Sequence, residues 1–306
     1  MEKKSNKNIS RLIIHSDDFG LNQSVNQAIF DTAKAGVLTS ASLMTNGMAS
    51  EEAIMGALKY PELGVGIHLN ILRGRPLSNP DKIPSIVDKD GCFFNSIYTL
   101  LLRSCMGLIS EQHIYDEYRQ QVLFMIENGL KPTHFDGEKH THILLPEAAR
   151  AVKRLKGEFD IHKVRLINET EMIHYCLSEG IKVDGTINQR LKLCLLEYRS
   201  RKLLKYWQQF IYPQHTFGVL ASGKICHPNS INLLNIFLNL PVSETIEWMF
   251  HIGYPFNYQK PQFTKEFGTY FLDETSRNQE LKFLLSEEVI EIIQNNKTQL
   301  ITYREL

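Results

Sequence analysis

The chain has 306 residues, 43% of them hydrophobic, which is enough for one large α/β domain or two smaller ones. Its 34 basic and 34 acidic residues cancel, which argues against binding nucleic acid through bulk charge, and no apolar run approaches the roughly 20 residues of a membrane span. Residues 1–10 lack the apolar core of a signal peptide and the five cysteines form no CxxC pair, so we expect a cytoplasmic protein with reduced thiols.

Strand and helix patterns alternate along the chain. The run RLIIHS is typical of a short buried strand, and the residues after it predict a helix that Ser24 caps. The strongest helix pattern covers 110–130 and begins at Ser110. In chain order we expect strand 11–16, helix 24–36, strand 39–47, helix 50–61, strand 63–70, helix 110–130, strand end 132–138, helix 146–159, strand 163–169, the apolar segment 245–255, helix 286–296 and strand 299–306.

This order of elements predicts the fold class. Repeated strand–helix units over about 300 residues favour a closed parallel β/α barrel, and an open doubly wound sheet is the alternative. No low-complexity linker or internal repeat divides the chain. We therefore expect a single domain over 1–306, with a possible helical insert at 187–214.

Polar side chains gather where the predicted strands end, which is where a β/α barrel carries its chemistry. A lone strand histidine such as His68 is more often a satisfied core residue. Several acids and imidazoles on one loop, however, would repel or compete unless a cation or a hydrogen-bond network organised them. The sequence therefore predicts a metal site. The strand-end residues are His15, Asp17, Asp18, His68, Asn70, His134, Asp136, Glu138, His140, His142, Arg165 and His251.

The adjacent acids Asp17 and Asp18 can have separate roles, although such a pair is usually a turn or a cap. Neighbouring side chains at a strand end point in different directions. One carboxylate can bind a cation while the other faces the substrate, and the cation then offsets the repulsion between the two charges. The free carboxylate can accept a proton from an activated water.

Six segments resemble successive blocks of the YdjC-like carbohydrate deacetylases, a family that includes chitooligosaccharide deacetylase and the hopanoid-associated deacetylase. The blocks occur in order over 11–260, and the final LITYREL also fits. The resemblance implies a distorted parallel β/α (TIM-like) barrel, a divalent metal and hydrolysis of the N-acetyl group of an amino sugar. The segments are IIHSDDFGLN, TSASLMTNG, VGIHLNILRGRPL, KPTHFDGEKHTHILLP, VRLINE and MFHIGYP.

Transferred position by position, the resemblance implies a role for each matching residue. Asp18 and His68 match metal ligands, and Asp17 matches the general base that takes a proton from the water. His251 falls where the family carries its catalytic acid, which protonates the leaving amine. Arg165 matches an arginine of the site. These residues would together release acetate and a free amino sugar.

Two positions depart from the family pattern. Glu138 stands where the family usually has a histidine as third ligand, and Ile252 stands where it has a proline. A glutamate ligand favours oxygen-preferring ions, so Mg²⁺ is the expected metal, with Mn²⁺, Zn²⁺ and Co²⁺ as alternatives. His140 is the alternative third ligand, or else the site has lost tight metal binding.

The sequence also suggests what the protein binds. Asn70 and Tyr254 are expected to contact the sugar, although an aromatic residue here is equally compatible with the core. The basic segment 187–214 can lie on a membrane surface or contact a lipid-linked sugar; the alternative is a solvated helix that covers the barrel. We also expect a homo-oligomer, a dimer, and no nucleic-acid partner.

Two other classes of protein fit the same residues. A metal-dependent hydrolase of another amide or of a phosphoester uses the same aspartate, histidine and metal. A sugar-binding relative with impaired catalysis is the second class, because Glu138 departs from the family pattern.

Overall fold

The computed structural model describes residues 11–183, 185–226, 229–240, 244–257, 261–267, 274–296 and 299–306. The N-terminal segment 1–10, where we expect no signal peptide, lies outside the described residues. The strands are β1 (Arg11–Phe19), β2 (Ser40–Leu43), β3 (Gly64–Leu69), β4 (Phe135–Gly137), β5 (His215–Phe217) and β6 (Thr245–Phe250). The helices are α1 (Gln23–Lys34), α2 (Ser50–Ala57), α3 (Ile97–Cys105), α4 (Glu111–Glu127), α5 (Thr141–Leu144), α6 (Pro146–Phe159), α7 (Thr170–Ser178), α8 (Ile187–Lys202), α9 (Leu204–Trp207), α10 (Asn229–Leu238), α11 (Pro261–Phe267), α12 (Glu274–Leu284) and α13 (Glu287–Asn295).

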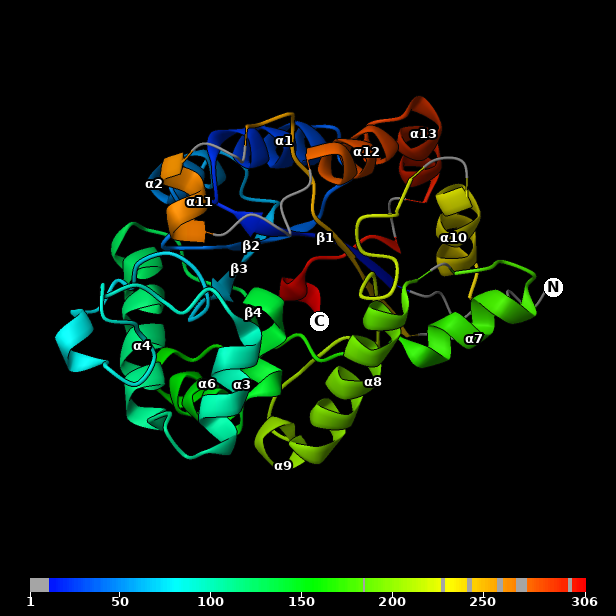
Figure 1. The fold of residues 1–306 in the computed structure, drawn as a ribbon. Coiled ribbons are helices and arrows are strands. Elements are labelled where there is room, and N and C mark those ends of the chain that lie inside the picture. The colour runs from blue at the N-terminus through cyan, green and yellow to red at the C-terminus, as the bar shows by residue number, and fades with distance from the viewer. Residues whose placement is uncertain are drawn as a thin grey trace.

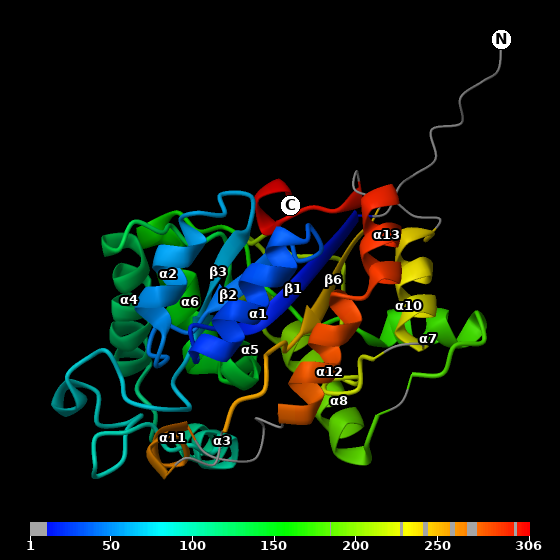
Figure 2. The ribbon, with the colours of Figure 1, turned by 90° about the horizontal axis from the view of Figure 1, so that it is seen from above.

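The six strands form one parallel sheet in the order β4-β3-β2-β1-β6-β5. The sheet curls, and helices cover its outside: α1, α2 and α12 lie on one side and α4, α6 and α8 on the other (Figure 1). Seen from above, the longest strand, β1, lies between β2 and β6 (Figure 2). Going round from β1, the strands follow in chain order, as they do in a barrel.

The segment 163–168 connects the two edge strands of the curled sheet. The amide of Phe135 in β4 donates to the carbonyl of Lys163, and the amide of Arg165 donates back to Phe135. At the other edge, the amide of Thr216 in β5 donates to the carbonyl of Asn168 at 3.0 Å. The prediction of a distorted parallel β/α barrel is therefore confirmed, and the open doubly wound sheet is not the fold.

Most predicted helix boundaries are confirmed. Helix α6 runs from Pro146 to Phe159, with the proline in its first turn. Helix α4 begins after Ser110, whose side chain accepts from the amide of His113. The expected cap at Ser24 is wrong, because Asn22 caps α1: its backbone is extended (φ −160°) and its side chain accepts from the amide of Val25.

Two predicted strands are not regular strands. The segment 163–169 makes single bridges, Phe135 to Val164 and Lys163 to Ile211, before α7 begins. Near the end of the chain, Leu300 bridges Leu12. The following residues form a 3₁₀ turn, Tyr303–Glu305, which the side chains of Thr302 and Glu305 close as a capping box. Such local side-chain hydrogen bonds compete with the ladder of a strand.

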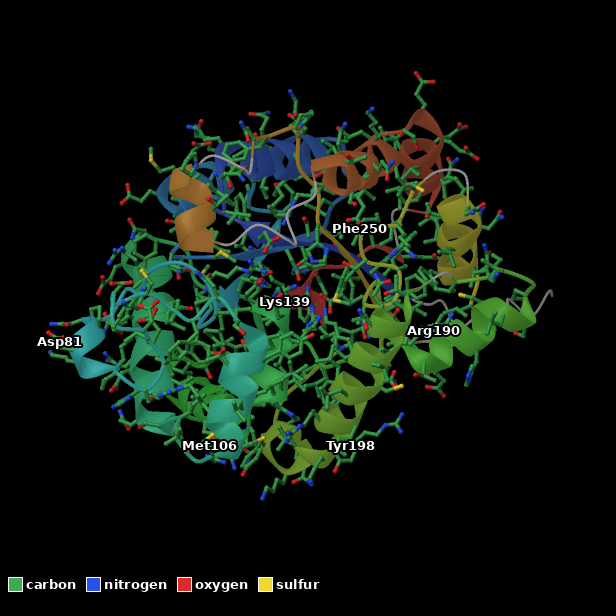
Figure 3. All side chains as sticks on the ribbon, in the orientation of Figure 1. Asp81, Met106, Lys139, Arg190, Tyr198 and Phe250 are labelled. Carbon is green, nitrogen blue, oxygen red and sulfur yellow. The ribbon has the colours of Figure 1, made fainter. Side chains whose placement is uncertain are left out.

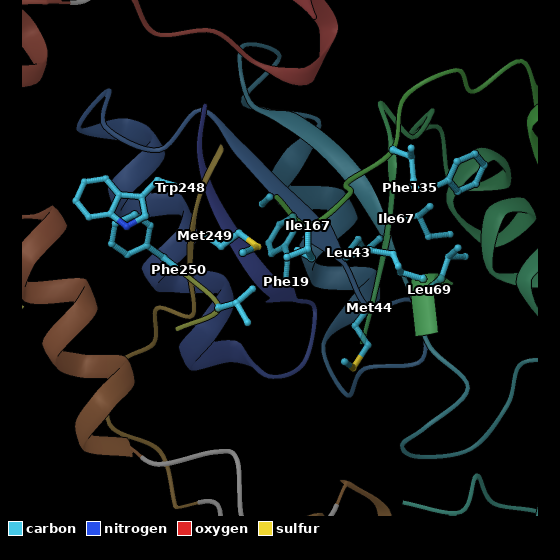
Figure 4. Packing of buried hydrophobic residues seen from close by; sticks show 14 of the residues in the cluster. Phe19, Leu43, Met44, Ile67, Leu69, Phe135, Ile167, Trp248, Met249 and Phe250 are labelled. Atoms are coloured by element: carbon cyan, nitrogen blue, oxygen red, sulfur yellow. The ribbon is translucent and has the colours of Figure 1, made fainter. Parts of the chain in front are cut away.

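The strands are buried on both faces, so they read as nearly continuous apolar runs. All six residues of β6 are buried, as are all six of β3. Trp248 packs against Phe250, with ring centroids 4.9 Å apart (Figure 4). It also packs against Phe237, at 5.0 Å. The polar exceptions in these strands, such as His68 and Glu247, point into the barrel and build the site described below.

The segment 187–214 forms α8 and α9 and then a short connection to β5. Leu193 and Leu196 face the core, whereas Leu191 is 64% exposed. The apolar residues of this segment therefore lie on two sides of the helix. Among the described residues no helix is both long and apolar enough to cross a membrane. Contact of this segment with a membrane surface, like the single domain and the dimer, stays a prediction.

Candidate active site

The two acids that end β1 have different surroundings. The pairing of β1 with β2 shifts register between Ser16 and Phe19, and Asp18 adopts a left-handed backbone (φ 67°). Asp17 lies 2.8 Å from Arg165 Nη2 and 3.0 Å from its Nη1. Asp18 instead accepts a hydrogen bond from Arg277 on α12. This irregularity is what separates the environments of two adjacent carboxylates.

The three predicted metal ligands lie together. His68 Nε2 is 3.7 Å from Asp18 Oδ1 and 3.4 Å from Glu138 Oε2. Each of the three residues offers one atom that could bind a metal, and these atoms all lie within 4.8 Å of one another. On the far side of the ring, His68 Nδ1 donates to Asp136 Oδ1 at 2.8 Å. A metal-bound histidine usually donates a hydrogen bond from its other ring nitrogen to a carboxylate, as His68 does here.

These residues fit a divalent cation. Burial opposes a charge on His68, but the charge of Asp136 and hydrogen bonds to Asp136 and Glu138 outweigh it and hold the pKa of His68 well above its usual value. A positive charge is therefore favoured where His68 meets the two acids. Among the described residues, two other groups of buried acids and histidines are close enough to bind a metal, and both include Asp136. Asp136 is already bonded to His68 and Arg165, so these groups are less open than the first.

The side chains of Glu138, His140 and His142, which follow β4, point in different directions. Lys139 and His140 are both left-handed, with φ of 51° and 57°, which is costly for residues other than glycine. Glu138 faces His68, whereas His142 Nε2 donates to the backbone carbonyl of Arg165. His140 lines a pocket and lies outside the group around His68. The structure thus places Glu138, not His140, beside Asp18 and His68.

Arg165 lies at the centre of the buried network. Its guanidinium contacts Asp17, lies 3.1 Å from Asp136 and donates from Nε and Nη2 to Glu247 at 2.9 and 2.7 Å. Tyr303 donates to the other oxygen of Glu247 at 2.6 Å. Burial favours the neutral acid at Asp17, but the charge of Arg165, together with a hydrogen bond to His15 and the nearby His68 and His251, outweighs it, so the pKa of Asp17 lies well below its usual value. Arg165 therefore keeps Asp17 ionised and fixes its direction.

His251 follows β6 and lies beside Asp17, with 3.7 Å between Nε2 and Oδ2. Its backbone amide donates to Glu280 on α12 at 2.6 Å. Burial lowers the pKa of His251 to about 4, although the neighbouring acids Asp17 and Asp18 act in the opposite direction. At neutral pH, a neutral imidazole therefore stands next to an ionised carboxylate.

The two other predicted substrate contacts are engaged within the protein. Asn70 Oδ1 accepts from the amides of Leu72 and Arg73, and its Nδ2 donates to the carbonyl of Arg73 at 2.9 Å. Tyr254 donates to Asp31 on α1 at 2.8 Å. Asn70 thus shapes the loop that carries Arg73, and Tyr254 links the chain after β6 to α1. Their contacts with a sugar stay predictions.

The pocket beside His251 has walls from the loop after β4, from α8 and from the end of β6. It brings together Asp17, Glu138, Lys139, Lys192 and His251. Burial lowers the pKa of Lys139 and of Lys192 to about 8. Figure 3 shows Lys139 near the centre of the molecule. The half-buried Lys192 comes from the predicted insert, so α8 contributes to the site.

Sequence reasoning missed several residues that contact the predicted ones. Arg73 stands within the quoted segment VGIHLNILRGRPL, where its charge in an apolar run is a usable signal. Arg277 and Glu280 lie in a polar helix with no distinguishing pattern. Only the fold brings that helix to the end of β1.

The buried histidine His142 gives a testable pH dependence. Burial lowers its pKa to about 4 from an ordinary 6.5. The folded state therefore favours the neutral ring, and this contribution is complete above pH 6.5 and is lost as the pH falls toward 4. Relative to His142→Gln, the wild type should lose about 3 kcal/mol of unfolding free energy across this window, measured by urea unfolding without metal.

A carboxylate supplies the control of opposite sign. Burial raises the pKa of Glu169 to about 7, while hydrogen bonds from the amides of Val219 and Leu220 act against that rise. Protonation then favours the folded state, so the wild type should gain stability relative to Glu169→Gln as the pH falls through 7. A constant difference between wild type and His142→Gln from pH 7.5 to 4.5 would contradict the first expectation.

Comparison with known proteins gives a consistent result. A model of a protein family described as YdjC-like protein matches residues 11–295. A carbohydrate deacetylase from Clostridium beijerinckii is 27% identical over 301 residues, which is 97% of this chain and 100% of the relative. A chitooligosaccharide deacetylase from Serratia marcescens is 25% identical over 72% of this chain and 88% of its own. Another carbohydrate deacetylase, 34% identical, is matched over only 62% of its own length.

A solved structure shares the fold. A protein from Enterococcus faecalis V583, provisionally described as a cellobiose-phosphate cleavage protein, superposes with a TM-score of 0.68. The match covers 97% of this chain and 98% of that one, at 20% sequence identity.

Proposed function

The chain belongs to the YdjC-like family, and from this premise we propose that it is a hydrolase that removes the N-acetyl group from an N-acetylated amino sugar, in an oligosaccharide or a glycolipid. Relatives named carbohydrate deacetylase and chitooligosaccharide deacetylase support this class of substrate. The observation that carries the proposal is the group of Asp18, His68 and Glu138 beside the pair Asp17 and His251.

Asp18, His68 and Glu138 would hold a divalent cation. Two carboxylate oxygens and one imidazole nitrogen favour an oxygen-preferring ion, so we propose Mg²⁺, with Mn²⁺, Zn²⁺ and Co²⁺ as the alternatives to compare. When bound, the cation would polarise the acetyl carbonyl and make a water more acidic. The third ligand of the proposal is Glu138, because it is the residue whose carboxylate faces His68.

Asp17 and His251 would move the proton. The ionised Asp17 accepts a proton from the attacking water, whose oxygen forms a bond to the acetyl carbon. His251 is neutral in the free protein, so the proton that it delivers originates in this water and passes from Asp17 across the 3.7 Å between them. His251 then protonates the nitrogen as the carbon–nitrogen bond breaks. The products are acetate and a free amino sugar.

The test is acetate release from a panel of N-acetylated mono- and oligosaccharides, with phosphate release from phosphoesters measured alongside. Protein treated with a chelator should release no acetate and should recover when Mg²⁺ or Mn²⁺ is returned. Phosphate release without acetate release would overturn the proposal in favour of a phosphoester hydrolase, in which Lys139 and Lys192 would face the phosphate. Binding of metal and sugar with no product would indicate an impaired, sugar-binding relative.

A further inference from the structure

Two arginines contact the carboxylates that face His68, each on the oxygen that points away from it. Glu138 turns Oε2 toward His68 and Oε1 toward Arg73, whose Nε lies 2.5 Å away. Asp18 turns Oδ1 toward His68 and Oδ2 toward Arg277. Each carboxylate therefore presents one oxygen to the centre of the group and is hydrogen-bonded through the other.

Arg73 is fixed from two sides. Its backbone is held by the side chain of Asn70, through bonds of 3.0 Å at the amide and 2.9 Å at the carbonyl. Its Nη1 donates to the carbonyl of Phe267, the last residue of α11. The side chain is only 5% exposed. A guanidinium held this firmly can fix the direction of the Glu138 carboxylate.

Arg277 makes the corresponding contact with Asp18. It comes from α12, the same helix that receives the His251 amide through Glu280. The side chains of Arg277 and Asp18 are 2% and 4% exposed. A charge pair this deeply buried is screened little by solvent, so each partner strongly affects the other.

We propose that Arg73 and Arg277 offset the negative charges of Glu138 and Asp18, by pairing with the oxygen of each carboxylate that points away from His68, and thereby weaken the attraction of these two ligands for a cation. This inference rests on the metal site of the proposed function. Glu138 with Arg73 then forms a ligand of nearly zero net charge. Its charge is thus comparable to that of the neutral histidine that the family usually has at this position.

The ion pair with Arg73 changes the net charge that Glu138 adds to the site. From the sequence alone, a glutamate ligand adds a negative charge to the site. In the structure Arg73 cancels that charge, so the cation would keep its electrophilic character. Removing Arg73 would leave a buried carboxylate without its partner, which destabilises the metal-free protein. The same unpaired charge would attract a divalent cation more strongly.

The experiment measures metal affinity and stability rather than turnover. Arg73→Gln and Arg277→Gln are compared with the wild type by calorimetric titration with Mn²⁺ and by thermal unfolding with and without saturating Mn²⁺. We expect each variant to bind Mn²⁺ at least about tenfold more tightly, because a nearby positive charge is gone. Without metal the unfolding midpoint should fall, and Mn²⁺ should raise it more than in the wild type.

Arg150→Gln is the matched control. Arg150 Nε also contacts a glutamate, Glu111, at 2.5 Å, but this pair is about one-third exposed and lies on α4 and α6. It should leave Mn²⁺ affinity unchanged. Arg73→Lys, which keeps the charge, should bind Mn²⁺ with nearly wild-type affinity and keeps the test available if Arg73→Gln does not fold. The double variant Arg73→Gln with Glu138→Gln should be no less stable without metal than Glu138→Gln alone.

Three results would overturn the proposal: equal losses of unfolding midpoint with and without Mn²⁺, unchanged Mn²⁺ affinity in both glutamine variants, or weaker binding in both. The reaction is tested separately. Acetate release with unchanged Mn²⁺ affinity in the variants would remove the charge-offsetting role of the arginines alone. The expected affinity changes in a protein that releases no acetate would remove the proposed reaction and leave the role of the arginines.

Discussion

Asp17→Asn should lower acetate release by about 10²–10⁴-fold and leave metal binding intact. Asp17 is held by Arg165 and lies 3.7 Å from His251, so its place is on the proposed proton path. An asparagine keeps the shape of the side chain but cannot accept the proton. The measurements are kcat for the best N-acetylated sugar and metal content by elemental analysis of the same preparation.

Asp18→Asn is the comparison that separates the two adjacent acids. Asp18 faces His68 Nε2 with one oxygen, so this variant should lose both metal and turnover. If Asp17→Asn lost the metal and Asp18→Asn kept it, the two assignments would be inverted. The group formed by Asp17, His68 and Asp136, which is also close enough to bind a metal, would then be the metal site.

His251→Ala should reduce hydrolysis of the N-acetyl sugar by about 10²-fold or more, and hydrolysis of an activated acetyl ester far less. An amine leaves poorly unless it is protonated, whereas a nitrophenolate leaves without help. His251 is the imidazole beside Asp17, and His140 is the other histidine that lines the pocket among the described residues. The ratio of the two rates in each variant is the measurement.

His140→Ala provides the matched control, because His140 lines the same pocket and burial likewise lowers its pKa well below the usual value. It should leave the ratio of amide to ester hydrolysis near that of the wild type. Equal losses on amide and ester in His251→Ala would assign His251 to binding or to structure instead of proton delivery.

Local features of the fold were predictable from the sequence because local signals determine them. The apolar positions Ile114, Tyr118, Val122 and Met125 recur on one face of α4 and are all buried. The segment 299–306 misled because its apolar residues suggest a strand, whereas the hydrogen bonds between Thr302 and Glu305 favour a turn. The prediction of Ser24 as the cap of α1 is wrong for a related reason: Ser24 and Asn22 are both good capping residues, and only the backbone conformation decides between them.

The candidate site was predictable where its residues follow strands. Asp17, Asp18, His68 and Glu138 all lie at strand ends, so the barrel prediction itself implied that they meet. Arg277 could not be found in this way, because 259 residues separate it from Asp18. A long-range ion pair leaves no periodic or motif signal in either segment. The pairing of Glu138 with Arg73 likewise depends on how a loop folds.

The long separation between Asp18 and Arg277 also bears on how the protein is made. Synthesis proceeds from the N-terminus, so β1 and its two acids leave the ribosome well before α12 exists. Until α12 has been made, Asp18 lacks its partner Arg277, and until β6 has been made, β1 lacks one of its neighbouring strands. Asp17 likewise lacks Arg165 until that part of the chain has been made. The nascent N-terminal part of the chain therefore has two carboxylates without the ion-pair partners of the folded protein, and β1 has one unpaired edge. These contacts can form only once the C-terminal part of the chain has been made, so the pairing of β1 with β6 is a late step in folding.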